Sequence, residues 1–217
     1  MNRFIFHGQH SSAAQPTKIF FLLAIVAALM VSGWLGIASP GDRNRQILVL
    51  ACIAVFVGRT AFMVIYLLPR SMGWREAFGD AVVVWLVACG LGVYWADAAD
   101  PLGWLDGLAL MLFLAGSALT TGSELGRKRW KQHHQGQLYT RGPFRFAQHI
   151  NYFGEVVSFA GVAMMTRTWW AAVVPVGMFL FFVLVHMPAL DRHLRERYGD
   201  DFADYQNRTH KIVPFVY

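Results

Sequence analysis

The sequence predicts an all-α protein, a polytopic membrane helix bundle of about six transmembrane helices followed by a C-terminal cytoplasmic interfacial helix. The 217 residues are 56% hydrophobic and only 15% charged, whereas soluble proteins carry about 25% charged residues. The apolar residues also gather in runs near 20 residues, about the length that a helix needs to cross ~30 Å of hydrocarbon. A water-soluble enzyme, a disulfide-rich secreted domain and a disordered chain are therefore excluded.

Charged or helix-breaking residues separate the apolar runs, as at Pro40, Pro69 and Pro101. The predicted spans are, in order, residues 19–38, 47–68, 78–96, 102–121, 151–165 and 169–190. The fifth span is short, so we expect it to be tilted or packed by its neighbours. An even number of spans places both termini on the same side of the membrane.

The positions of the basic residues predict which side that is. Of the 19 Lys and Arg residues, 15 fall on the side of the termini, 3 fall on the other side, and Arg59 lies within a span. Loops rich in Lys and Arg stay in the cytoplasm. We therefore expect a multi-pass protein, placed in a bacterial inner membrane with both termini cytoplasmic.

The chain changes character after residue 121. We expect residues 1–121 to form N-terminal transmembrane helices, and residues 122–217 to hold a cofactor-binding loop, a helical hairpin and an amphipathic tail within one integrated membrane domain. Cys52 and Cys89 lie in apolar runs, and no Cys/His spacing typical of zinc occurs, so we predict no metal. The net charge is +6, but the distribution of the basic residues between the two sides of the membrane accounts for it. We therefore predict no nucleic-acid partner. We predict no particular oligomeric state from the sequence.

A basic segment follows the fourth span directly. Within it, Arg127 and Lys131 are four residues apart and would share one helical face at the membrane edge. Such a pair can bind a phosphate by charge-assisted hydrogen bonds. The alternative interpretation is a basic cluster that anchors the helix end to anionic membrane lipid.

Polar side chains also crowd the entry of the fifth span. They are Arg141, Arg145, His149, Asn151, Tyr152 and Glu155. Membrane anchoring would explain the arginines and the tyrosine, but not Glu155, which lies about one turn inside an apolar helix. A buried carboxylate is costly unless it is paired, and ionisable residues within a membrane are candidates for function.

The C-terminal segment has apolar residues at helical spacing: Leu194, Tyr198, Phe202 and Tyr205. This pattern predicts an amphipathic helix lying along the cytoplasmic interface. Such a helix could also close a cofactor pocket from the water side, with Asp191 and Tyr205 as hydrogen-bond partners.

Residues 149–155, His-Ile-Asn-Tyr-Phe-Gly-Glu, resemble the His-Pro-Asn-Tyr-x-Gly-Asp/Glu box of the integral-membrane sterol reductases and steroid 5-alpha-reductases. The tail, from Arg-Tyr-Gly at 197–199 to Tyr217, looks like the sterol-reductase ending. The resemblance covers roughly residues 122–217. This C-terminal superfamily also includes the isoprenylcysteine carboxyl methyltransferases and the phospholipid methyltransferases.

The resemblance implies an NADPH-dependent reductase, embedded in the membrane, that acts on a carbon–carbon double bond of a lipid or steroid-like substrate. Residues 125–131 resemble the sterol-reductase segment whose basic pair holds the phosphates of NADPH. The implied catalytic residues are Glu155 and Tyr152, one of which donates or relays the proton. The implied cofactor-binding residues are Arg127, Lys131 and Arg145 for the phosphates, His149 and Asn151 for the carboxamide or ribose, and Asp191 and Tyr205 for closing the pocket.

Two alternatives stay open. Residues 138–145 carry Leu-x-Thr-x-Gly-Pro-Phe-Arg, a phrase common in the methyltransferase branch, where the cofactor is S-adenosylmethionine. Gln148 and Ile150 replace the Arg and Pro that are usual in the reductase box. A non-catalytic bundle that binds lipid or a partner is therefore the second alternative.

Overall fold

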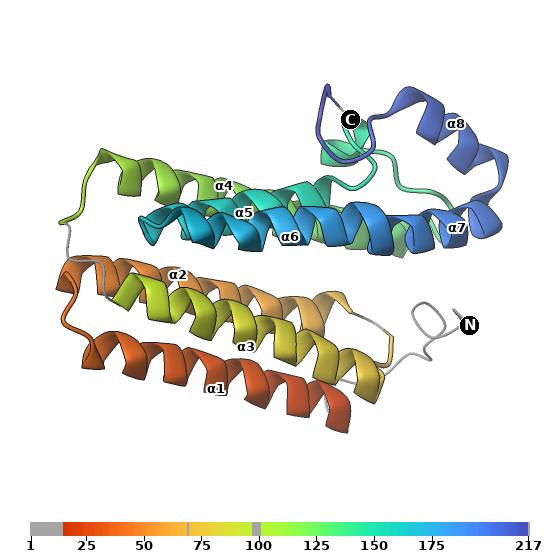
Figure 1. Ribbon diagram of the computed structural model, residues 1–217. Coiled ribbons are helices and arrows are strands. Elements are labelled where there is room, and N and C mark those ends of the chain that lie inside the picture. The colour runs from red at the N-terminus through yellow and green to blue at the C-terminus, as the bar shows by residue number, and fades with distance from the viewer. Residues whose placement is uncertain (1–14, 69, 97–100, 217) are drawn as a thin grey trace. The chain divides into compact units, whose positions relative to one another are not determined.

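The computed structural model describes residues 15–68, 70–96 and 101–216, with the side chains of residues 89–96 left out. The described residues confirm the all-α class (Figure 1). The helices are α1 Pro16–Ala38, α2 Arg43–Phe62 continued by the π-helix η1 Met63–Leu67, α3 Trp74–Ala96, α4 Trp104–His133, the 3-10 turn η2 Gly142–Arg145, α5 Ile150–Met165, the 3-10 turn η3 Trp169–Ala172, α6 Val173–Phe181, the π-helix η4 Phe182–His186, α7 Met187–Tyr198 and α8 Asp200–Arg208.

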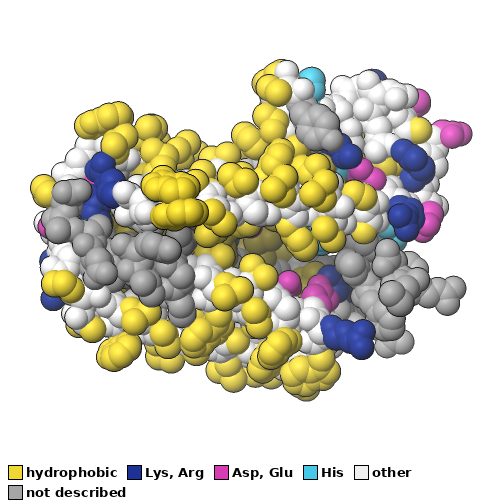
Figure 2. All heavy atoms as spheres, in the orientation of Figure 1, with side chains coloured by type: hydrophobic (Ala, Val, Ile, Leu, Met, Phe, Trp, Pro, Cys, Tyr) yellow, Lys and Arg dark blue, Asp and Glu magenta, His cyan; other side chains and the backbone are white. Residues whose placement is uncertain are grey.

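Several helices present apolar surfaces suited to lipid. By length and composition, four described stretches can cross a membrane: Pro16–Ala38, Arg43–Leu67, Trp104–His133 and Trp169–Tyr198. Ile150–Met165 is a shorter apolar helix. Figure 2 shows many hydrophobic side chains on the surface of the helices. Leu23 and Leu184, for example, are 65% and 68% exposed. The protein is therefore an integral membrane protein, and the count of six spans stays a prediction.

The chain forms two compact units that alternate along the sequence. The first contains Met1–Phe113 and Ala160–Val174, and the second contains Leu114–Phe159 and Pro175–Tyr217. Helices α4, α5 and α6 contribute residues to both units.

In the first unit, α1 packs against α2 and α3. Polar side chains at the start of α1 donate hydrogen bonds to backbone carbonyls of residues that follow α2. The Lys18 ammonium, which is fully buried, donates to the Leu68 carbonyl at 2.8 Å, and the Thr17 hydroxyl donates to the Met72 carbonyl at 2.8 Å. These bonds hold the start of α1 against the connection between α2 and α3, because buried carbonyls need a donor.

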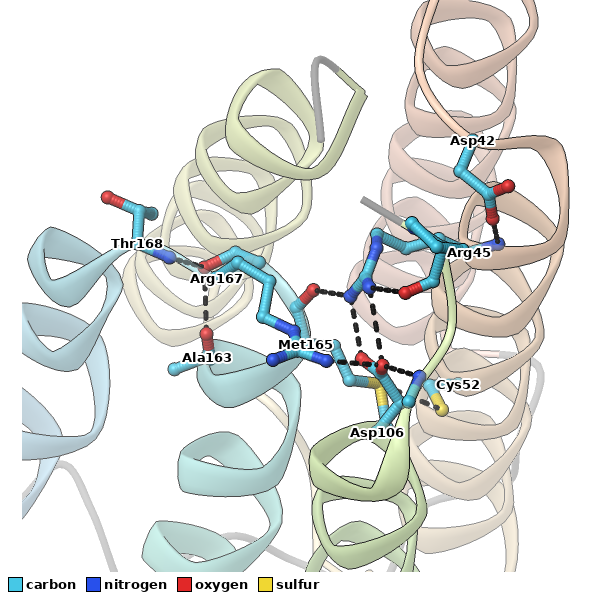
Figure 3. Close-up of polar contacts among 11 residues, drawn as sticks. Asp42, Arg45, Cys52, Asp106, Ala163, Met165, Arg167 and Thr168 are labelled. Carbon is cyan, nitrogen blue, oxygen red and sulfur yellow. Dashed lines mark hydrogen bonds and ion pairs between the residues drawn. The ribbon is translucent and has the colours of Figure 1, made fainter. Parts of the chain in front are cut away.

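A buried ionic cluster joins three other chain segments of the first unit (Figure 3). Arg45, near the start of α2, is 0% exposed, and Asp106, in the first turn of α4, is 3% exposed. Two guanidinium nitrogens of Arg45 meet the two carboxylate oxygens of Asp106, at 2.6 and 3.2 Å. Arg167, which follows α5, donates to Asp106 Oδ2 at 2.7 Å. Arg45 also donates to the carbonyl of Met165 at 2.9 Å, so its charge is paired and its remaining donors are used.

In the second unit, α4 and α5 touch backbone to backbone. A Cβ atom added at Gly154 would lie 2.5 Å from the Thr120 hydroxyl oxygen and 2.8 Å from the Gly116 carbonyl oxygen. A Cβ atom added at Gly116 would lie 2.5 Å from the Gly154 carbonyl. Small residues permit such close helix contacts in membranes. This crossing sets the distance between α4 and the first turns of α5.

We expect Gly154→Ala to destabilise the protein by about 1–3 kcal/mol, because the added methyl group cannot fit without moving one helix. Gly122→Ala, on the same helix α4 that Gly154 meets, is the matched control, since nothing lies within 4 Å of its added Cβ. That control should be neutral or stabilising by up to about 1 kcal/mol through helix propensity. Thermal unfolding in detergent measures both, and equal midpoints for the two variants would contradict the close crossing.

The C-terminal segment is two helices where the sequence analysis predicted one. Gly199 has φ of +50°, a conformation that glycine adopts readily, and it separates α7 from α8. The apolar side chains that predicted the amphipathic face still point inward: Phe202 and Tyr205 are buried, and Leu194 and Tyr198 are half-buried. In Figure 2, charged side chains gather over this end of the chain.

Candidate functional site

The basic segment after the fourth predicted span is helical, because α4 continues without interruption to His133. The sequence analysis had expected a loop to begin at residue 122. Arg127 and Lys131 consequently lie one turn apart on α4, as their spacing predicts. Arg127 forms an ion pair through Nη2 with Oε2 of Glu124, which is 8% exposed and lies on the preceding turn.

Asn151, in the first turn of α5, meets α4 twice. Its side-chain amide nitrogen donates to Glu124 Oε1 at 2.9 Å, and its backbone carbonyl accepts from the Thr120 hydroxyl at 2.9 Å. Glu124 thus contacts two of the predicted site residues, Asn151 and Arg127, one with each carboxylate oxygen. Glu124 was not among the residues predicted for the site, although its spacing of three residues from Arg127 is a signal that identifies it.

Lys131 links the end of α4 to the end of α7. Its ammonium donates to the Tyr198 hydroxyl at 3.3 Å and lies 5.8 Å from the centre of the same ring. An ammonium has three donors, and among the described residues Lys131 donates only to Tyr198, so it keeps donors for an anion. Arg145 is exposed, and its guanidinium lies 4.4 Å from the centre of the Phe146 ring.

His149 and Asp191 form a pair that joins the segment before α5 to α7. His149 Nε2 lies 2.8 Å from Asp191 Oδ1, and the His149 side chain is 2% exposed. The C-terminal tail fixes the backbone at this position, because the amides of Gln148 and His149 donate to the carbonyls of His210 and Lys211 at 2.8 and 3.0 Å. The histidine is therefore held from two directions.

Tyr152 lies at the centre of an aromatic stack. Its ring is stacked on His149, with centroids 5.6 Å apart, and on Phe182, at 4.6 Å, while His186 meets it edge-on at 5.2 Å. Phe182 and His186 belong to the π-helix η4, and π-helical turns are frequent at functional sites. Tyr152 thus connects His149, which pairs with Asp191, to the π-helix η4.

Tyr205 supports this region from α8. Its hydroxyl donates to the Phe144 carbonyl at 2.6 Å, and its side chain is 5% exposed. Burial raises the pKa of the Tyr205 phenol, so the hydroxyl keeps its proton and the bond over the accessible pH range. Its hydroxyl therefore holds the turn η2, and any contact with a ligand would be additional to that role.

The second predicted catalytic residue, Glu155, lies one turn after Asn151 on α5 and is half-buried. On α4, Trp130 Nε1 and Thr121 Oγ1 are buried and have no hydrogen-bond partner in the described part of the chain.

The second unit thus brings together two cations on α4, an oriented amide, a histidine–carboxylate pair and a tyrosine. Cations that keep spare donors suit phosphate oxygens, and the amide suits a polar ring substituent. The donor set therefore fits a nucleotide cofactor. Within the described residues, no three His, Cys, Asp or Glu side chains lie close enough to hold a metal ion.

Comparison with known proteins gives two matches. Residues 77–209, more than half of the chain, match the family described as a protein of unknown function, DUF1295. The chain is 28% identical over 163 residues to the Delta(14)-sterol reductase of Saccharomyces cerevisiae, across 68% of this chain and 37% of that protein. The chain thus spans little more than a third of that relative's length. Together the matches confirm the predicted resemblance to the membrane sterol reductases, while Tyr217 of the tail motif lies outside the described residues.

Proposed function

This chain belongs to the DUF1295 family, and we propose that it is a membrane-embedded reductase. In this proposal it uses NADPH to reduce a carbon–carbon double bond in a lipid or steroid-like substrate. The likeness to a sterol reductase supports the reaction class. The observation that carries the proposal is a pair of contact chains at the start of α5: Arg127–Glu124–Asn151, and Asp191–His149–Tyr152. We call these six residues the polar cluster.

In this proposal, the cofactor's phosphates bind to Arg127 and Lys131. Both side chains already have one partner within the protein, Glu124 and Tyr198, and these partners hold them in place before the ligand arrives. Holding a side chain in its bound geometry reduces the entropy that binding costs. Exposed Arg145 adds a third cation, and Asn151 and His149 contact the polar end of the nicotinamide.

Reduction of a double bond requires a hydride at one carbon and a proton at the other. When bound, NADPH supplies the hydride. The Tyr152 hydroxyl donates the proton, and the stacked rings of His149 and Phe182 fix its position. Glu155, one turn further into α5, relays a replacement proton in this proposal. Positioned acids of this kind contribute about 10²–10⁴-fold to a rate.

The apolar character of the helices supports the substrate class. The exposed faces of η4 and α6 carry Leu180, Phe181, Leu184 and Val185, which are 48–68% exposed. A lipid substrate can reach Tyr152 from this side, because Phe182 and His186 of η4 contact its ring directly. Apolar walls also exclude water, which protects the hydride transfer from side reactions.

Titration of the purified protein in lipid nanodiscs tests cofactor binding, with energy transfer from tryptophan to the reduced nicotinamide as the signal. We expect saturable binding of NADPH, weakened about tenfold or more in Arg127→Gln and in Lys131→Gln, since a hydrogen bond to a charged group contributes about 1.5–3 kcal/mol. Arg75→Gln, an exposed arginine in the first unit, is the control and should bind normally. Unchanged NADPH affinity in both α4 variants would contradict the assignment of the phosphate site.

A methyltransferase is the second candidate. Residues 138–145 resemble the methyltransferase branch, and their Gly142–Arg145 part forms the turn η2, which Tyr205 holds directly before α5. Such an enzyme would bind S-adenosylmethionine and would need a base for the acceptor. Calorimetric titration with S-adenosylmethionine separates the two candidates, because binding of this methyl donor without binding of NADPH favours the methyltransferase.

A further inference from the structure

We propose that Glu124 is a positioning residue that fixes the Asn151 amide, so that Asn151 presents its carbonyl oxygen to an amino or primary carboxamide group of the ligand. This inference rests on the proposed function: the ligand is NADPH, and Asn151 accepts a hydrogen bond from its carboxamide group. It follows from contacts within the second unit.

The position of Asn151 is determined by several contacts at once. Thr120 and Glu124 are one turn apart on α4, and they bind the backbone carbonyl and the side-chain amide of Asn151, respectively, each at 2.9 Å. One turn later on α5, Gly154 contacts Thr120 and Gly116 so closely that an added Cβ would lie 2.5 Å from the Thr120 hydroxyl. With the backbones this close, Asn151 cannot move away from Glu124 without separating the helices.

The chemistry of the pair then sets the direction of the amide. A carboxylate accepts hydrogen bonds and cannot donate them, while an Asn amide has a donating NH₂ group and an accepting carbonyl. Asn151 therefore turns its NH₂ group toward Glu124 Oε1, since the reversed amide would place two acceptors against each other. The carbonyl oxygen Oδ1 is left on the other side of the amide plane, where it can accept from a ligand N–H group.

Arg127 secures the carboxylate itself. It holds Glu124 Oε2, so each carboxylate oxygen has its own partner and the group cannot rotate without breaking one of them. Glu124 is 8% exposed, so water competes little for either bond. Through this one side chain, the phosphate-binding residue Arg127 and the amide-reading residue Asn151 are linked.

A pair of ligands tests this assignment by binding alone. The 3-acetylpyridine analogue of NADPH carries a methyl group where NADPH carries the carboxamide NH₂, and is otherwise the same. The wild-type protein should bind NADPH about tenfold more tightly than the analogue, the ratio expected for one hydrogen bond. In Glu124→Ala this ratio should fall to near one, because the amide is free to turn. In Glu124→Gln the ratio should fall to about threefold, because a Gln side chain can accept from or donate to Asn151.

Glu196→Gln, an exposed carboxylate on α7, is the control and should keep the full ratio. A merely structural role for Glu124 would weaken both ligands equally, and a tenfold ratio kept in Glu124→Ala or in Glu124→Gln would overturn the inference. Should Glu124→Ala not fold, the isosteric Glu124→Gln variant decides the question. Equal affinity of the wild type for both ligands would overturn the inference while leaving NADPH binding intact, whereas failure of the wild type to bind either would overturn the proposed function as well.

Discussion

Asp106→Ala is expected to lower the free energy of unfolding by about 3–5 kcal/mol, the usual cost of removing one partner from a buried ion pair. Asp106 is 3% exposed and binds both Arg45 and Arg167, and Arg45 is 0% exposed. Without the carboxylate, the Arg45 guanidinium would keep carbonyl partners such as Met165 but would lose the bidentate ion pair with Asp106. Figure 3 shows how the two arginines approach Asp106 from different segments of the first unit.

A second ion pair in the same unit provides the control. Arg70 and Glu76 also pair, but their side chains are 22% and 27% exposed. Glu76→Gln should therefore cost at most about 1 kcal/mol, because partly exposed pairs are screened by water. Thermal or denaturant unfolding in the same detergent measures both variants. A loss for Asp106→Ala no greater than that for Glu76→Gln would show that the buried cluster does not stabilise the first unit as described.

Tyr152→Phe is expected to lower the turnover rate at least 100-fold while changing the affinity for NADPH by less than about twofold. The substitution removes only the hydroxyl, so the ring stacks on His149 and Phe182 should persist. A positioned proton donor contributes about 10²–10⁴-fold, whereas the proposed cofactor contacts lie on other residues. A large effect on rate with a small effect on binding is therefore the signature of a proton donor.

The rate of this variant can be measured without knowing the substrate. NADPH that carries deuterium at both hydrogen positions of nicotinamide C4 is incubated with the protein in nanodiscs containing a total membrane lipid extract, and mass spectrometry follows deuterium into lipids. Tyr66→Phe serves as the control, since Tyr66 lies in η1 of the first unit and is 46% exposed. If Tyr152→Phe transferred deuterium at the wild-type rate, the Tyr152 hydroxyl would not be the proton donor, and Glu155 would be the next residue to test.

The membrane helices were predictable because apolar runs and helix-breaking residues can be identified from short stretches of sequence. The predicted span 19–38 corresponds to α1 Pro16–Ala38, and the span 151–165 corresponds to α5 Ile150–Met165. The continuation of α4 to His133 was not predicted. A change from apolar to polar residues marks where a helix leaves the membrane, but the helix itself can continue beyond that point. The division between α7 and α8 depends on the single residue Gly199, whose positive φ follows from how the two helices pack.

The pairings within the polar cluster were only partly predictable. Spacing placed Arg127 and Lys131 on one face of a helix, and the resemblance pointed to His149, Asn151 and Asp191. That Asn151 binds Glu124, and that Tyr205 binds the Phe144 carbonyl, depends on contacts between segments 27 and 61 residues apart. The first contact lies at the close crossing of α4 and α5, and the second joins α8 to the turn η2. A single sequence does not reveal either packing.

The central claim is that this chain reduces a lipid with NADPH at the site around Tyr152, and the deuterium experiment with the wild-type protein tests it most directly. We predict that at least one lipid gains one deuterium and one hydrogen across a former double bond, at a rate that depends on NADPH concentration. The account would be contradicted if saturating labelled NADPH left every lipid unlabelled while S-adenosylmethionine with a deuterated methyl group labelled one of them.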